Sequence, residues 1–266
     1  MGAPVIERYT TPEPITIDLR IPAGRIEIDA VETDETVVEV DPRNGPARDT
    51  LDKLVIALDG THLRVEAPES RGFLGRSPEY AVEIRCPAGS KVKVRSASTD
   101  VTGRGRLGSL EVKTASGDVS AEDVDGDVNV DSASGDVRVG SAGGRVQIRT
   151  ASGDLGVARA HGPVKAQSVS GDVEVGEADA AVEVQTVSGD LKVGRVAAGP
   201  LNVNAVSGDV DVSIVPGTAV WLDLRSLSGD MRSELEAGDG PADGEHVVEV
   251  RGKTVSGDVR VRRAAA

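Results

Sequence analysis

The sequence predicts an all-β protein, a parallel β-solenoid (β-helix) with about 18 residues per coil and an irregular N-terminal β cap. The first observation is a Ser-Gly-Asp motif that occurs nine times, counting one near relative. The second is a valine-rich alternation of apolar and polar residues. The third is the scarcity of aromatic residues, 2% of a chain that is 38% hydrophobic, because ordinary globular cores use more Phe, Tyr and Trp.

The period of the repeat is clearest in its aspartates. The first six are each separated by 18 residues, and the next three follow after 19, 21 and 28 residues. The column is Asp100, Asp118, Asp136, Asp154, Asp172, Asp190, Asp209, Asp230 and Asp258. A fixed period of this length is typical of a solenoid in which neighbouring coils bury one another.

Residues 1–90 are predicted to form the cap, continuous with the solenoid. About six segments alternate apolar and polar residues, which predicts strands. They are centred on residues 15–19, 26–28, 37–40, 54–58, 63–65 and 82–84. Asp59-Gly60 predicts a β-hairpin, and Pro22-Ala23-Gly24 and Pro87-Ala88-Gly89 predict turns. A cap is expected because the first coil would otherwise expose strand edges.

Residues 91–266 are predicted to form the Ser-Gly-Asp solenoid, with two short strands in each coil. Two apolar columns should form its narrow core, since β-branched residues suit stacked strands. The first is Val92, Leu110, Val128, Val146, Val164, Val182, Leu201, Leu222 and Val250. The second is Val101, Val119, Val137, Leu155, Val173, Leu191, Val210, Met231 and Val259.

Two segments interrupt the alternation and are predicted to be exposed loops. One is residues 71–78, where the only Phe lies beside a Leu and two arginines. The other is EAGDGPADGEH, between Met231 and Val250. Such loops often make contacts, although a plain connection is the simpler interpretation.

Composition limits the partners. The formal net charge of −14 disfavours nucleic acid and anionic membrane surfaces. No apolar run is long enough to span a bilayer, the N-terminus lacks a signal-peptide core, and the lone Cys86 cannot form an internal disulfide. We therefore expect a cytoplasmic protein without direct membrane insertion, with surface or envelope association as the alternative.

The Asp column is the one feature that could carry chemistry. Carboxylates about 5 Å apart repel one another by about 1 kcal/mol in water, so something must offset that repulsion. In the structural interpretation, each Gly supplies a positive φ at a turn and the Asp accepts a backbone N–H. The turn glycines are Gly117, Gly135, Gly153, Gly171 and Gly189. In the functional interpretation, Asp118, Asp136, Asp154, Asp172 and Asp190 form an interaction ladder that binds calcium, although the calcium-binding nonapeptide is not matched.

A Ser/Thr-x-Ser pattern precedes most of the turns, as in Thr114-Ala-Ser116. The alternation predicts that both hydroxyls point inward, where they would bond one another and the backbone. An exposed hydroxyl face is the alternative.

No catalytic grouping is predicted. His62, His161 and His246 lie in unrelated contexts, and no nucleophile elbow, phosphate loop or paired Cys/His motif is present. We expect no cofactor, no metal centre and no enzymatic activity.

The segment VEIRCPAGSKVKVRSASTDV, followed by repeats of V-x-(S/T)-x-SGD-(V/L)-x-V, resembles the bacterial putative adhesin domain family. The resemblance covers most of the chain and implies a β-solenoid without known catalysis. The chain departs from the pattern at Thr99, which occupies the glycine position of the first copy. The resemblance identifies no functional residues.

Three functions remain open at this point. The leading one is a non-enzymatic scaffold that binds a protein or an envelope-associated partner. The second is a self-assembling solenoid, because Val255–Val261 form the last coil with little sequence left to cap it, although Arg260, Arg262 and Arg263 could guard that edge. The third is a calcium-dependent surface adhesin.

Overall fold

The computed structural model describes residues 4–68, 77–235 and 247–264. The predicted fold class is confirmed, because the described residues form a parallel β-solenoid with little helix. Both predicted loops lie largely outside the described residues, namely residues 71–76 of the first and all of the second, 236–246. The chain divides into two compact units, Met1–Gly135 and Asp136–Ala266, which are described in turn.

Each regular coil has a leading strand before the Ser-Gly-Asp turn and a trailing strand after it. In the first unit the regular strands are β8 (Ser109–Ser116), β9 (Val119–Val124) and β10 (Val128–Ser134). The leading strands β8 and β10 pair in parallel, with Val128 opposite Leu110. The 18-residue period of the sequence is therefore the register of the sheet.

Two long strands each form a whole coil of the first unit. They are β2 (Thr16–Val31) and β7 (Lys91–Leu107), which pair in parallel from Thr16–Lys91 to Ala30–Gly105. Thr99 lies within β7 and is buried, so this coil turns its corner without a left-handed residue at that position. The regular stacking therefore already includes residues 16–31.

The remaining strands of the first unit cover β2. Two pair with it in parallel, β5 (His62–Glu66) and β6 (Glu79–Pro87). The other three strands form antiparallel pairs: β1 (Val5–Thr10) with β3 (Glu35–Pro42), β3 with β6, and β4 (Val55–Asp59) with β5. A short helix α1 (Gly45–Asp49) and a 3-10 turn η1 (Leu51–Lys53) follow β3.

The cap strands agree with the sequence in most respects. The hairpin at Asp59-Gly60 is confirmed, since β4 and β5 pair antiparallel and Gly60 has φ 58°. The turn predicted at Pro22-Ala23-Gly24 to separate two strands is wrong, because β2 runs through these residues. Gly24, with φ 123°, makes the bend inside β2 while pairing continues on both sides. Neither β1 nor α1 was predicted from the sequence.

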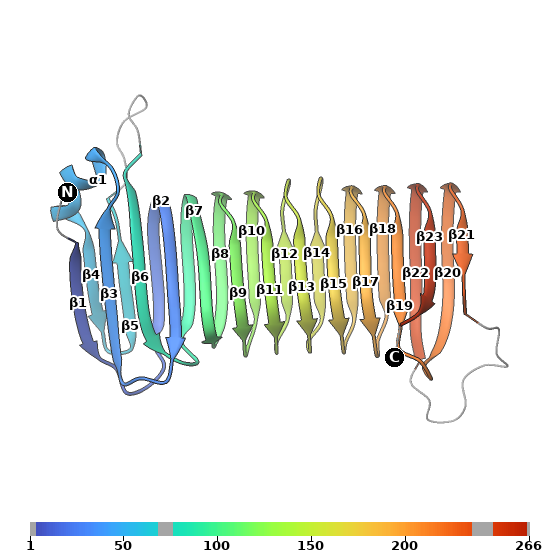
Figure 1. Cartoon of the computed structure of the whole chain (residues 1–266), viewed down its shortest axis with the longest axis horizontal. Coiled ribbons are helices and arrows are strands. Elements are labelled where there is room, and N and C mark those ends of the chain that lie inside the picture. The colour runs from blue at the N-terminus through green and yellow to red at the C-terminus, as the bar shows by residue number, and fades with distance from the viewer. Residues whose placement is uncertain (1–3, 69–76, 236–246, 265–266) are drawn as a thin grey trace. The chain divides into compact units, whose positions relative to one another are not determined.

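In the second unit the leading strands pair in parallel with one another along one face of the solenoid, and the trailing strands pair in parallel along another face (Figure 1). The leading strands are β12 (Val146–Arg149), β14 (Val164–Gln167), β16 (Val182–Ser188), β18 (Leu201–Ser207), β20 (Ala219–Ser228) and β22 (Val247–Ser256). The trailing strands are β11 (Val137–Ala142), β13 (Leu155–Ala160), β15 (Val173–Ala178), β17 (Leu191–Val196), β19 (Val210–Ile214), β21 (Met231–Ser233) and β23 (Val259–Arg263).

The last coil in sequence is not the outermost coil of this unit. β22 pairs with β18 on one side and β20 on the other, and β23 pairs with β19 and β21 (Figure 1). The prediction of an uncapped final coil guarded by Arg260, Arg262 and Arg263 is therefore wrong. Asp230 and Asp258 are 28 residues apart rather than 18, so the chain is long enough to return and place β22 between β18 and β20.

Both predicted core columns are buried, with two exceptions. Sixteen of the eighteen residues lie among the buried hydrophobic side chains. Leu222 is only half-buried and Met231 is 51% exposed. Both lie on the β20/β21 coil, which has a stacked neighbour on one side only within the described residues.

Candidate functional site

The Asp column forms a ladder of hydrogen bonds between coils. In each step within a unit, a carboxylate oxygen of one Asp accepts the backbone N–H of the Asp in the neighbouring coil. In the second unit, Asp154 N lies 2.9 Å from Asp136 Oδ1 and Asp190 N lies 2.8 Å from Asp172 Oδ1. The ladder continues through the β22/β23 coil, where Asp258 N donates to Asp209 Oδ1, and ends on the outermost coil, where Asp230 N donates to Asp258 Oδ1, both at 2.9 Å.

These hydrogen bonds offset part of the repulsion within the column. At Asp136 the N–H of Asp154 and the guanidinium of Arg138, 2.8 Å away, hold the pKa of the carboxyl below its usual value. In the first unit, Asp118 N donates to Asp100 Oδ1 at 3.0 Å. The carboxylates are thus engaged by the backbone of the adjacent coil, and not by their own turn as predicted from the sequence.

The glycines before these aspartates permit the close stacking. Gly189 has φ 136°, and a Cβ at this position would lie 2.1 Å from the carbonyl oxygen of Gly171. Gly117, Gly135, Gly153 and Gly171 also have φ between 117° and 126°. At Gly189 any other residue would be strained both by its backbone conformation and by contact with the adjacent coil.

The geometry of the column does not supply a metal cage. Among the described residues, no three His, Cys, Asp or Glu side chains are grouped so that they could hold a metal ion. The calcium interpretation of Asp118, Asp136, Asp154, Asp172 and Asp190 thus gains no ligand set from this part of the chain.

The hydroxyls of the Ser/Thr-x-Ser pattern separate into two environments. The first hydroxyl points inward and bonds the backbone, as in Thr114 Oγ1 to the carbonyl oxygen of Ser116 at 2.7 Å and Thr150 Oγ1 to that of Ser152 at 2.9 Å. The second does not point inward, and Ser152, Ser170 and Ser188 are exposed. The prediction for the second hydroxyl is therefore wrong, because the chain has already begun to turn there.

The middle position of this three-residue pattern forms an exposed apolar stripe on the second unit, which we call the valine stripe; in one coil Ala205 replaces the first hydroxyl. Its members occupy equivalent positions in consecutive coils and are 47–84% exposed. In spatial order they are Val169, Val187, Val206, Val255 and Leu227. Single exposed valines are common, but an aligned series of them is characteristic of a binding surface.

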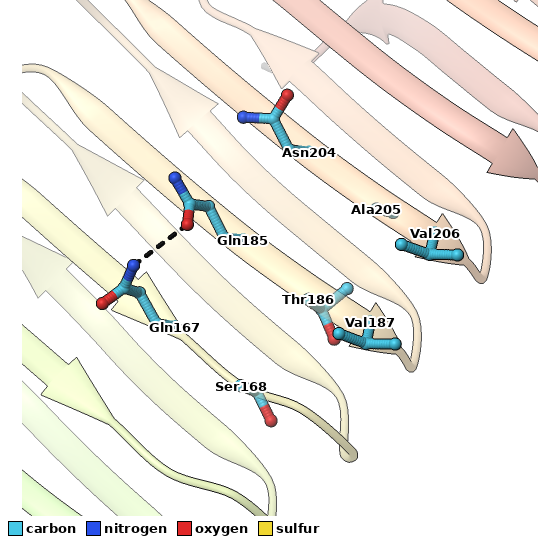
Figure 2. Close-up of a pocket in the computed structure, with 8 residues that line it drawn as sticks. All are labelled: Gln167, Ser168, Gln185, Thr186, Val187, Asn204, Ala205 and Val206. Atoms are coloured by element: carbon cyan, nitrogen blue, oxygen red, sulfur yellow. Dashed lines mark hydrogen bonds between the residues drawn. The ribbon is translucent and has the colours of Figure 1, made fainter.

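A shallow groove of about 410 Å³ runs beside this stripe (Figure 2). Val187 and Val206 line it together with the side-chain amides of Gln167, Gln185 and Asn204. Gln167 Nε2 donates to Gln185 Oε1 at 3.0 Å, as the dashed line in Figure 2 shows. The arrangement offers apolar contact on one side and amide hydrogen-bonding groups on the other, which suits recognition rather than bond-breaking chemistry.

One polar atom in the groove is unsatisfied. Ser168 is 6% exposed, and its Oγ has no hydrogen-bond partner among the described residues. The equivalent Thr150 and Thr186 both bond a backbone carbonyl. Buried hydroxyls normally have a partner, but the Ser168 Oγ is itself inaccessible, so it offers no direct contact to a ligand in this groove.

The valine stripe was not predicted from the sequence, although a signal was present. The middle residue of the pattern is Ala at positions 115, 133 and 151, Val at positions 169, 187, 206 and 255, and Leu at position 227. The hydroxyl residues on either side recur more regularly in the sequence, so the change from Ala to larger apolar residues at the middle position is easily overlooked.

The remaining candidate residues do not converge on a site. His161 Nδ1 lies 2.7 Å from Asp179 Oδ2 in an exposed pair, and His62 lies at the edge of the hairpin. His246 is outside the described residues. Cys86 is buried, and burial raises the pKa of its thiol to about 11.

No helix within the described ranges is long and apolar enough to cross a membrane.

Solved structures show the same fold at low identity. A crystal structure described as a putative adhesin from Bacteroides fragilis is 14% identical, with 98% of each chain covered and a TM-score of 0.52. A putative adhesin from Parabacteroides distasonis is 12% identical, with 98% of this chain and 97% of that chain covered and a TM-score of 0.52. No protein with a curated description matches the chain.

A family model establishes the relationship directly. The model described as Toastrack DUF4097 matches residues 25–262, which includes β7 and every Ser-Gly-Asp coil. The chain therefore belongs to the Toastrack DUF4097 family.

Proposed function

We propose that the chain is a non-enzymatic binding scaffold of the adhesin type, and that the valine stripe with its adjoining groove is the surface that binds the partner. The observation that carries this proposal is the stripe itself, in which residues 169, 187, 206, 255 and 227 are all exposed and apolar. The partner is a protein or an envelope-associated molecule that presents an apolar strip.

The scaffold supports this role by holding the side chains at a fixed spacing. Parallel strands lie about 4.8 Å apart, so the stripe is a row of methyl groups at that interval. Each coil is fixed by backbone pairing on both faces and by the Asp ladder between them. Little ordering entropy then opposes binding, which favours affinity for a given contact area.

A site-specific photocrosslinker tests the proposal. Incorporated at Val187, it should capture a partner from cells that express the full chain, and the additional change Val206→Ser should reduce that capture at least fivefold. The matched control is the crosslinker at Val55, a valine of β4 with 44% exposure on the first unit. Equal capture at both positions, or capture unchanged by Val206→Ser, would refute the stripe as the binding surface.

A second candidate function, self-assembly, is favoured by a separate observation. The β20/β21 coil has a stacked neighbour on one side only within the described residues. This coil is a different part of the second unit from the groove, and a second copy of the chain is the partner that it fits.

A further inference from the structure

The outer edge of β20 has no strand paired with it among the described residues. β20 pairs with β22 along its whole length, from Ala219–Val247 to Ser228–Ser256, without a bulge. It is ten residues long and contains no proline. Edge strands are usually protected by being short, bulged, proline-containing or charged. Of these features β20 has only its two charged residues, Asp223 and Arg225, and its long regular edge is a template for another strand.

The inward side chains of this coil are also incompletely covered. Leu222 and Leu224 are half-buried, whereas Val250, the neighbour of Leu222 in the adjacent strand, is 1% exposed. On the trailing sheet Met231 is 51% exposed and its neighbour Val259 is 1% exposed. These side chains have the position of core residues without a next coil to bury them.

The outward face of β20 carries Trp221, Asp223, Arg225 and Leu227. Trp221 is 50% exposed and Leu227 is 84% exposed. Arg225 reaches back along its own strand to Asp223, with Nε 3.1 Å from Oδ1. The order is apolar, acidic, basic, apolar, which is complementary to itself when reversed.

We propose that two copies of this chain associate through β20, pairing antiparallel about a twofold axis at Leu224. This arrangement places Trp221 opposite Leu227 of the second copy and Asp223 opposite its Arg225. Each of these pairs occurs twice, as a closed twofold interface requires. Opposite charges and apolar pairs directly across an antiparallel ladder are favourable.

Registers centred on a charged residue, or between two residues, are disfavoured by charge or by the faces that they bring together, and the axis at Leu224 pairs both charged residues with opposite charges. An axis at Asp223 would set that residue opposite its own copy, and an axis at Arg225 would do the same for two guanidinium groups, so like charges would meet. An axis between two residues would exchange inward and outward side chains. The palindromic pattern thus favours a second copy over an unrelated strand. The pairing deepens the second candidate function, self-assembly, and shares only Leu227 with the valine stripe.

Sedimentation velocity of the full chain over a range of concentrations tests the pairing. The wild type should shift from one to two copies as concentration rises. Arg225→Asp should weaken association at least tenfold, because Asp223 of each copy then faces a second carboxylate across the axis, and Asp223→Arg should do the same with two guanidinium groups. The double exchange Asp223→Arg with Arg225→Asp should restore dimers, since opposite charges face one another again.

The control is Arg43→Asp, which reverses the partner of Asp41 in an exposed pair of the first unit at 2.9 Å. It should leave association unchanged, and circular dichroism should show native strand content for every variant. A wild type that stays monomeric, species larger than two copies, or a double exchange that fails to restore dimers while folded would each overturn the proposal.

Discussion

The cap of the first unit and the outermost coil of the second unit differ in how their inward-facing side chains are covered. In the cap, β5 and β6 continue the stack, antiparallel strands border them, and Ile17, Leu19, Ile26 and Ile28 of β2 are fully buried. In the β20/β21 coil the equivalent positions are half-buried or exposed. The difference shows that a solenoid position is a core position only when a coil or a cap lies on both of its sides.

The largest effect should come from a charge placed in a fully stacked coil. Val146→Asp should cost about 3–4 kcal/mol of unfolding free energy, because Val146 is fully buried and its column is apolar. Met231→Asp, in the outermost coil, should cost less than about 1 kcal/mol. Urea unfolding followed by circular dichroism measures both, and similar losses would contradict the contrast between stacked and outermost coils.

Glycine replacement should give the next largest effect. Gly189→Ala should cost about 2–3 kcal/mol, since the new Cβ meets the Gly171 carbonyl at 2.1 Å and the residue has φ 136°. Gly229→Ala in the outermost coil creates the same contact with Gly257, but that coil can shift away from its single neighbour. Thermal unfolding should therefore show a clearly smaller loss for Gly229→Ala; equal losses would mean that the outermost coil is held as firmly.

A smaller effect is expected on the pH dependence of the free energy of unfolding, through the carboxylate of Asp136. Because the folded-state pKa of Asp136 is lowered, its stabilisation is present above the usual Asp pKa and is lost as pH falls through the folded value. Asp136→Asn should therefore cost about 0.5–1 kcal/mol at pH 7, and the difference from wild type should shrink as pH falls below the usual Asp pKa and through the lowered folded-state value. Unfolding measured from pH 7 to pH 2.5 tests this, and a difference that grows toward low pH would contradict it.

The smallest expected effect on stability comes from thiol labelling, which measures only how accessible a cysteine side chain is to a reagent. Burial and the raised pKa, about 11, should keep the Cys86 thiol unreactive toward a disulfide reagent at pH 8 until the cap unfolds. In a Met231→Cys variant the new thiol should react at least a hundredfold faster. Rapid labelling of Cys86 in the native wild type would show that the cap opens readily.

Most of the fold could be predicted from the sequence, because period and register are the same quantity in a solenoid. The 18-residue spacing alone places Leu110 beside Val128, as the structure confirms. The spatial order of the last two coils could not be predicted. The spacing of 28 residues between Asp230 and Asp258 indicates an insertion, but it does not indicate on which side of the β20/β21 coil the chain continues. For the same reason Leu222 and Met231 were wrongly counted as core residues.

The candidate site was less accessible to sequence reasoning. The valine stripe consists of ordinary residues whose meaning comes from alignment across coils, and Val255 precedes Leu227 in space although it follows it in sequence. The Asp column was conspicuous in sequence, yet its carboxylates serve mainly as acceptors for the backbone of the next coil. Conspicuous repetition here indicates how the coils are held together.

The order of the coils can be measured directly, and both the stripe and the β20 edge depend on it. Asn202 lies opposite Arg251, and Arg251 lies opposite Asp223. A double variant with cysteines at positions 202 and 251 should form a disulfide under mild oxidation, detected by mass spectrometry of the intact chain, while cysteines at 202 and 223 should not. A disulfide between positions 202 and 223, with none between 202 and 251, would show that the coils stack in sequence order and would contradict the account.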